Sequence, residues 1–139
     1  MKPIYLLNAI DTHTAGEPTR VVLSGIPKLM GHTMMGKRNY FMQHYDFLRT
    51  AIINEPRGHE SMYYAVITPP TIEEAEFGQF FMCPRGYPTM CGHGTIGVVT
   101  VMIETGAISY SGSSRTVIID TPVGIVEAKA EINDGEVKR

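Results

Sequence analysis

The residues best suited to chemistry lie in the segment TMCGHGTIGVV, residues 89–99. Cys91 and His93 stand two positions apart among three glycines, directly before an apolar run typical of a buried helix. A cysteine at a helix N-terminus lies against unpaired backbone N–H groups and the positive end of the helix dipole. That position favours the thiolate and can lower the pKa of the thiol. The spacing therefore predicts a reactive thiol at Cys91.

The glycines around Cys91 predict a ligand site at the same helix end. Gly92 and Gly94 carry no side chain, so a ligand can approach the backbone closely. The free N–H groups there are suited to a carboxylate. A thiol beside a bound carboxylate can move a proton at the carbon alpha to that carboxylate. The alternative interpretation is that Cys91 is a small buried apolar residue, as most cysteines are.

Two other uses of Cys91 are a metal site and a redox-active thiol. His13 and His59 are further candidate ligands, but neither CxxC nor HExxH spacing occurs, and zinc takes four ligands or three with a water. We therefore predict no metal. A redox role needs a resolving cysteine, and only Cys83, at the end of an expected strand, is available for it.

Further polar side chains in turns and loops could support a site. His13, in the turn THTAGEP, is interpreted first as a turn-forming residue and second as a residue that lines a cleft. For four others we favour structural ion pairs and loop hydrogen bonds over a direct role: Glu17, Arg20, Arg57 and His59. His44 is expected in the core, and Tyr87 is expected to serve packing.

Hydrophobic periodicity predicts the elements that position these residues. The expected strands are Ile4–Ile10, Thr19–Ser24, Met62–Thr68, Phe77–Cys83, Arg115–Asp120 and Val123–Ile132. An amphipathic helix is expected over Gly36–Thr50. A second helix over Gly94–Thr105 is apolar on nearly every side and ends at Gly106, so we expect the fold to enclose it. The pattern predicts an α+β fold, in which a mixed sheet wraps round a central buried helix.

The C-terminal segment EINDGEVKR indicates an incomplete element. Asn133-Asp134-Gly135 is a strong hairpin-turn signal, and only Glu136–Arg139 remain for the return strand. We therefore expect residues 1–139 to be one N-terminal domain, cut within an element of a longer chain.

Composition restricts the class of protein. The chain has 139 residues, 43% of them hydrophobic and 19% charged, with a net charge of −2, so no electrostatic attraction to nucleic acid or an anionic membrane is expected. No apolar run approaches the roughly 20 residues of a membrane span, and Met1–Leu7 lacks the layout of a signal peptide. Two cysteines make no disulfide framework, which favours a reduced, cytoplasmic setting.

Four segments together resemble the proline racemase family, which includes hydroxyproline 2-epimerases and trans-3-hydroxyproline dehydratases. They are IDTHTAGEPTRVV at 10–22, NEPRGHESM at 54–62, FGQFFMCPRGYPTMCGHG at 77–94 and MCGHGTIG at 90–97, which overlaps the third segment. They occur in the family's order at plausible spacing, so the resemblance spans nearly the whole chain.

The resemblance implies a fold, a reaction and site residues. It implies a half of the diaminopimelate epimerase type, with the active site between two similar halves and one catalytic residue at the N-terminus of each central helix. Cys91 would be the first-half acid/base, without pyridoxal phosphate, another cofactor or a metal. The backbone N–H groups of Gly92 and His93, with Gly94 beside them, would bind the carboxylate of proline or hydroxyproline. The His93 side chain would lie near the ring nitrogen, and His13, Arg57 and His59 would give support.

The chain departs from the family in one respect, because the second catalytic element, with its Ser-Pro-Cys-Gly-Thr segment, is absent. In the family, a cysteine there goes with racemisation or epimerisation and a threonine with dehydration, so both reactions stay open. The other class that stays open is a non-catalytic carboxylate-binding or reactive-thiol module. A homo-oligomer is possible, and we expect the chain alone to be inactive.

Overall fold

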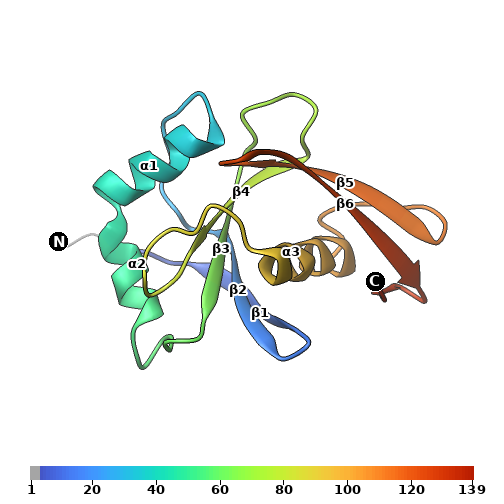
Figure 1. Ribbon diagram of the computed structural model, residues 1–139, viewed down its shortest axis with the longest axis horizontal. Coiled ribbons are helices and arrows are strands. Elements are labelled where there is room, and N and C mark those ends of the chain that lie inside the picture. Colours follow the sequence, from blue (N-terminus) through green and yellow to red (C-terminus); the bar gives the residue numbers. More distant parts are fainter. Residues whose placement is uncertain (1–3) are drawn as a thin grey trace.

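The computed structural model describes residues 4–139 (Figure 1). The expectation for Met1–Leu7 therefore falls partly outside the described residues. The strands are β1 (Asn8–Thr14), β2 (Glu17–Ser24), β3 (Tyr63–Thr68), β4 (Phe77–Met82), β5 (Ser114–Thr121), β6 (Gly124–Asn133) and β7 (Glu136–Val137). The helices are α1 (Met34–His44), α2 (Asp46–Ile53) and α3 (Gly92–Glu104).

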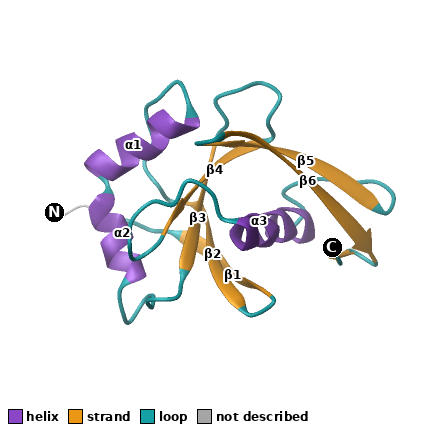
Figure 2. Cartoon of the chain, viewed as in Figure 1, coloured by secondary structure: helices purple, strands orange, loops and turns teal. Residues whose placement is uncertain are grey.

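The strands form a single mixed sheet in the order β1-β2-β3-β4-β5-β6-β7. The β2–β3 and β4–β5 pairs are parallel, and the other neighbouring pairs are antiparallel. Figure 2 shows the sheet curling round α3, while α1 and α2 lie beyond β3 and β4 on the other side. The predicted α+β fold, a mostly antiparallel sheet around a central helix, is confirmed.

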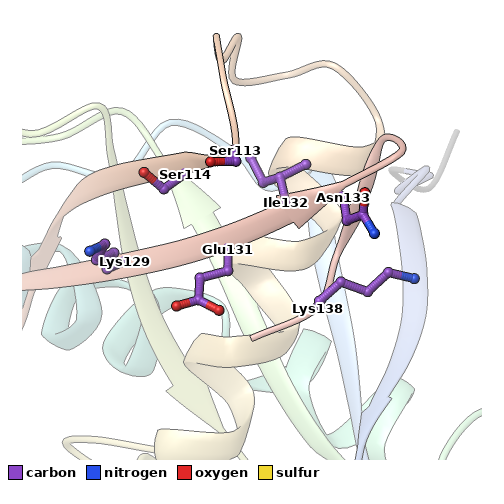
Figure 3. A pocket seen from close by; sticks show the side chains of 7 residues that line it. All are labelled: Ser113, Ser114, Lys129, Glu131, Ile132, Asn133 and Lys138. Carbon is purple, nitrogen blue, oxygen red and sulfur yellow. The ribbon is translucent and has the colours of Figure 1, made fainter.

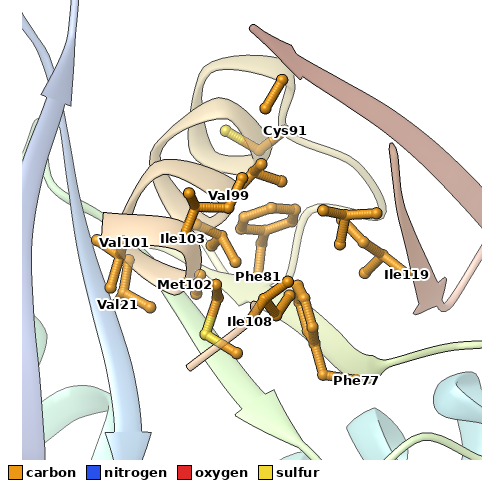
Figure 4. Packing of buried hydrophobic residues seen from close by; sticks show 14 of the residues in the cluster. Val21, Phe77, Phe81, Cys91, Val99, Val101, Met102, Ile103, Ile108 and Ile119 are labelled. Carbon is orange, nitrogen blue, oxygen red and sulfur yellow. The ribbon is translucent and has the colours of Figure 1, made fainter. Parts of the chain in front are cut away.

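Strand β4 separates the two hydrophobic cores. Successive side chains of a strand point to opposite faces, and all six residues of β4 are buried. Phe77 and Phe81 pack in the cluster around α3, whereas Phe80 and Met82 pack in the cluster beneath α1 and α2. In Figure 4 the Phe81 ring lies at the centre of the cluster around α3. The sheet is thus covered on both faces at the strand that precedes Cys91.

The first hairpin is longer than predicted. Strand β1 continues to Thr14, which pairs with Glu17, so the loop holds only Ala15 and Gly16. Both loop residues have positive φ, 49° and 91°, as a two-residue hairpin loop requires. The predicted strand start at Ile4 was wrong, because residues 4–7 are not in the sheet.

The predicted helix Gly36–Thr50 is two helices. Helix α1 begins after Thr33, whose hydroxyl accepts a 3.0 Å hydrogen bond from the Gly36 N–H, and it ends at Tyr45 with φ −131°. The prediction that His44 lies in the core was wrong. His44 is exposed at the last turn of α1, where its ring lies 4.3 Å from the ring of Tyr40.

Helix α3 is buried on its sheet side only. The side chain of Ile96 is 54% exposed and Glu104 is also exposed, so the helix is not enclosed all round.

The predicted turn before β7 is confirmed, with φ of 50° at Asp134 and 81° at Gly135. Among residues 4–139, no helix combines the length and apolar character that a membrane crossing requires.

Candidate active site

Cys91 is the N-cap residue of α3, with φ −147° and ψ 107°. The first helical hydrogen bond runs from the Thr95 N–H to the Cys91 carbonyl, at 2.9 Å. The Cys91 sulfur lies 3.4 Å from Nδ1 and 3.6 Å from Nε2 of His93, and the residue is 7% exposed. The structure therefore brings the thiol and the imidazole into contact at the predicted helix end.

The electrostatics of the thiol differ from the prediction. Burial raises the pKa of the Cys91 thiol. The Gly94 N–H acts in the opposite direction, because it faces the sulfur, although the sulfur accepts no capping hydrogen bond. The negative charge of Glu17 raises this pKa further. The expected lowering of the pKa was wrong, because desolvation outweighs the helix end at this buried sulfur.

The two glycines beside Cys91 have different roles. A Cβ at Gly92 would meet nothing within 4 Å, so the space beside this position is open. A Cβ at Gly94 would lie 2.7 Å from Cε1 of Phe81 and 3.0 Å from the Cys91 sulfur. The space that a side chain would take at Gly94 is therefore already filled by Phe81 and by the thiol.

His93 is held from two sides. The Thr14 hydroxyl donates a 3.0 Å hydrogen bond to its backbone carbonyl. Its ring meets the ring of Tyr63 edge to face, with centroids 5.0 Å apart and an angle of 85° between the planes. Arg85 Nη2 donates a 3.4 Å hydrogen bond to the Tyr63 hydroxyl. The imidazole is thus fixed between β3 and the first turn of α3.

The other predicted residues make local contacts. Nδ1 of His13 accepts a 3.2 Å hydrogen bond from the Gly16 N–H, so His13 stabilises its own hairpin turn. Arg57 donates to the Ala51 carbonyl, and Nδ1 of His59 accepts from the Ser61 N–H, so both stabilise the loop after α2. Arg20 forms a two-bond ion pair with Asp11, at 2.6 and 2.9 Å.

The loop that leads to Cys91 is tied to α2. Arg49 Nη1 donates hydrogen bonds of 3.1 and 3.3 Å to the Cys83 and Pro84 carbonyls. The Tyr87 hydroxyl donates a 2.5 Å hydrogen bond to Asp46, which also accepts from Arg49 at 2.7 Å. Burial and the Asp46 carboxylate raise the pKa of Tyr87, so its phenol stays protonated as a donor. Tyr87 therefore packs, as predicted, and also hydrogen-bonds.

Two surface hollows lie in different places relative to the thiol. A shallow one of about 290 Å³ adjoins the site at Tyr63, between Cys83 and the loop 85–88. A larger one of about 600 Å³ lies along β6 and its return segment, with Lys129, Glu131 and Lys138 among its side chains (Figure 3). Next to this hollow, the Val137 N–H donates a hydrogen bond to the Glu104 carboxylate. Glu104 is the last residue of α3, about 20 Å along the helix axis from Cys91. The larger hollow is therefore separate from the thiol.

Four residues around the helix end were not among the predicted site residues. They are Thr14, Tyr63, Gln79 and Thr95. A signal existed for Gln79, which is an amide in an otherwise apolar strand, FGQFFM. Within residues 4–139, no three His, Cys, Asp or Glu side chains gather as a metal ion would require.

Comparison with known proteins places these features in a family. Residues 9–139 match the family profile described as proline racemase. The chain is 46% identical over 138 residues to a trans-3-hydroxy-L-proline dehydratase of Bacillus thuringiensis and to a proline racemase of Clostridioides difficile. In both cases the match covers 99% of this chain and 41% of the relative, so the chain spans about two fifths of these relatives' length.

A solved structure shows the same fold. A hydroxyproline epimerase from Agrobacterium vitis, with bound trans-4-hydroxy-L-proline, superposes with a TM-score of 0.89 at 26% identity. The match covers 94% of this chain and 39% of that chain. With the profile match over almost the whole sequence, these similarities show that the chain belongs to the proline racemase family.

Proposed function

We propose that the protein carrying this chain is a cofactor-independent racemase or epimerase of proline or hydroxyproline, with Cys91 as an acid/base at the α-carbon. The observation that carries the proposal is the place of the Cys91 sulfur, at the N-cap of α3, 3.4 Å from His93 and beside the open Gly92. The names of the relatives support this substrate class.

The backbone N–H groups of Gly92 and His93 form what we call the carboxylate cradle. Groups in the first turn of a helix have no intrahelical acceptor, so they are free to donate to a carboxylate. The Gly94 N–H faces the sulfur instead, which leaves the first two groups for the substrate. A carboxylate held there places its α-carbon within reach of the thiol.

Proton transfer then follows in two steps. The Cys91 thiolate takes the α-proton, so the S–H bond forms as the C–H bond breaks and the electron pair stays on the carbon, next to the carboxylate. A second acid on the opposite face, supplied from outside this chain, protonates the carbon and inverts it. Because burial raises the pKa of the thiol, His93 has a role as well: its ring nitrogen at 3.4 Å can accept the thiol proton.

The second candidate function is dehydration of trans-3-hydroxyproline. One relative at 46% identity is named trans-3-hydroxy-L-proline dehydratase, and another at the same identity is named proline racemase. Both reactions begin with removal of the α-proton, for which Cys91 suffices. They differ in the group on the opposite face, which determines whether the carbon is reprotonated or hydroxide leaves.

The test is exchange of the substrate α-proton in D₂O, followed by NMR with the full-length protein and each substrate. We expect deuterium at the α-carbon, and we expect Cys91→Ser to slow this exchange by at least about 100-fold. Cys83→Ser, which changes the other buried cysteine, should retain exchange. Wild-type rates in Cys91→Ser would rule the assignment out, and water loss from trans-3-hydroxy-L-proline would identify the dehydratase.

The remaining candidate, a non-catalytic or reactive-thiol module, is tested with the 139-residue chain alone. Two opposed groups are needed to invert a carbon, and we expect this chain to provide one. It should bind proline weakly, turn over none, and self-associate through exposed apolar side chains near the site, such as Met90 and Ile96. Racemisation of proline by a preparation that mass spectrometry shows to consist of residues 1–139 alone would contradict this expectation.

A further inference from the structure

Gln79 is a fully buried amide beneath the first turns of α3. It is 0% exposed and lies between Phe77 and Phe81 on the side of β4 that faces α3. Its Nε2 donates a 3.2 Å hydrogen bond to the Thr95 hydroxyl. This bond joins β4, in the middle of the sheet, to the helix that carries Cys91.

The Thr95 hydroxyl passes this connection to Cys91. It donates a 2.9 Å hydrogen bond to the Cys91 carbonyl, which also accepts the Thr95 N–H at 2.9 Å. A side chain of the sheet thereby reaches the backbone of the N-cap residue through two hydrogen bonds in series.

The geometry of a peptide group carries the effect to the ligand side. The Cys91 carbonyl and the Gly92 N–H belong to one planar peptide unit and point in opposite directions. Two hydrogen bonds on the carbonyl oxygen therefore also fix the direction of the Gly92 N–H, at the position that is open to a ligand.

Burial of Gln79 is unfavourable for stability alone. No protein group in the described part of the chain donates a hydrogen bond to its Oε1, although the atom is buried. A buried polar atom without a partner destabilises the folded state, and an apolar side chain of the same shape would avoid that penalty. The packing of the core thus does not account for an amide at this position.

We propose that Gln79, acting through Thr95, is a positioning residue that orients the Cys91–Gly92 peptide of the carboxylate cradle. This inference rests on the proposed function, because it assigns a task to the cradle. Gln79 itself does not touch the substrate.

The first experiment separates positioning from stability in the full-length protein. Gln79→Met keeps the length of the side chain and removes the donor, and Thr95→Val removes the hydroxyl. Each should lower kcat/KM for the active substrate about tenfold, mainly through a higher KM. The double variant should lose little more than either single one, because both act through one chain of bonds. Thr95→Ser should restore activity.

Two controls make the result specific. Thr100→Val removes the same kind of hydrogen bond from α3, the 2.9 Å bond to the Ile96 carbonyl, and should leave kcat/KM within about twofold. Gln79→Met should melt at or above the wild-type temperature, because it removes the unpartnered oxygen. Wild-type kinetics in Gln79→Met, or a loss of activity that only follows a lower melting temperature, would overturn the inference.

The second experiment needs no turnover and uses the 139-residue chain. Iodoacetate carries a carboxylate and iodoacetamide does not, so the ratio of their rates at Cys91, mapped by mass spectrometry, reports on the cradle. We expect this ratio to fall severalfold in Gln79→Met and to stay unchanged in Thr100→Val. A wild-type ratio no higher than in the urea-unfolded chain would count against the cradle itself. A high ratio retained by Gln79→Met would count against Gln79 alone.

Discussion

The hydroxyl of Thr14 donates a 3.0 Å hydrogen bond to the backbone carbonyl of His93, 79 positions later in the chain. Thr14 is the last residue of β1, at the tip of the first hairpin, and His93 is in the first turn of α3. On its other side the His93 ring meets Tyr63. The residue that contacts the thiol is therefore held by two strands that precede it.

Thr14→Val tests this connection. Valine suits a strand and keeps the shape, so the main loss is one part-buried hydrogen bond, and we expect about 1 kcal/mol less free energy of unfolding in urea titrations. The control is Thr50→Val, which removes an exposed hydroxyl bond to the Phe47 carbonyl at the same 3.0 Å. Equal losses in the two variants would mean that Thr14 has no special role.

Gly94→Ala and Gly92→Ala form a matched pair within the first turn of α3. The methyl group at 94 would meet the Phe81 ring at 2.7 Å and the Cys91 sulfur at 3.0 Å, so we expect a loss of about 1–3 kcal/mol. The methyl group at 92 would meet nothing within 4 Å, so the free energy of unfolding should fall by less than about 0.5 kcal/mol. A reversed order in thermal or urea unfolding would contradict the packing described for Gly94.

The pH dependence of alkylation tests the environment of the Cys91 thiol. Burial raises its pKa, so between the ordinary value and the raised one the folded chain keeps the thiol while the unfolded chain has the thiolate. Iodoacetamide should therefore modify Cys91 with a midpoint above the free-cysteine value of about 8.5, and more slowly than in urea. The rate is read for each cysteine by mass spectrometry. A midpoint below 8.5 would restore the prediction made from the helix end.

The same shift has a consequence for stability. Because the pKa of the Cys91 thiol is higher in the folded state, its contribution to the free energy of unfolding is complete below the pKa of the unfolded chain. This contribution declines as the pH rises beyond that pKa. Cys91→Ala should therefore weaken the loss of stability as the pH rises above about 8.5.

Acid should weaken the attachment of the loop 84–88 to α2. The hydrogen bonds from Arg49 hold the pKa of the Asp46 carboxyl below its usual range, against the effect of burial, and Tyr87 contributes in the same direction. This stabilisation is complete above the unfolded value, about 3.9, and is lost as the pH falls through the lower folded value. Arg49→Met should flatten the fall in stability below about pH 4, measured by urea titration.

Arg57→Met is the control for that measurement. Arg57 donates to the Ala51 carbonyl and makes no ion pair among the described residues. It should leave the acid slope unchanged. If the acid slope of stability is also unchanged in Arg49→Met, the Asp46–Arg49 ion pair makes no measurable contribution to stability, which is true of many surface ion pairs.

Local signals predicted much of the fold. Strand and helix positions in the second half of the chain agree with periodicity, and Asn133-Asp134-Gly135 formed the expected turn because positive φ is intrinsic to such residues. The break at Tyr45 was not predictable in this way. Its φ of −131° divides one amphipathic pattern into two helices, and Tyr45 packs against the hydrophobic cluster beneath α1 and α2, which the tertiary fold assembles.

Only the residues of the candidate site that are close together in the sequence could be predicted. Cys91 and His93 are sequence neighbours, so their spacing and the glycines revealed them. The pKa of the thiol was predicted in the wrong direction, because burial depends on Phe81 and the rest of the core around it. Gln79 and Thr14 reach the helix end from 16 or more positions away, and neither periodicity nor a local motif encodes that distance.

The position of α3 in the chain, between β4 and β5, determines the order in which the parts of the candidate site are synthesised. The groups that hold its first turn come from β1, β3 and β4, and all of them precede Cys91 in the chain. Synthesis adds about 5–20 residues per second, so these strands are available before the thiol emerges, whereas β5 and β6 follow it. The groups that fix the first turn of α3 are therefore all synthesised before Cys91, whereas the part of its hydrophobic cluster that β5 and β6 supply is synthesised after it.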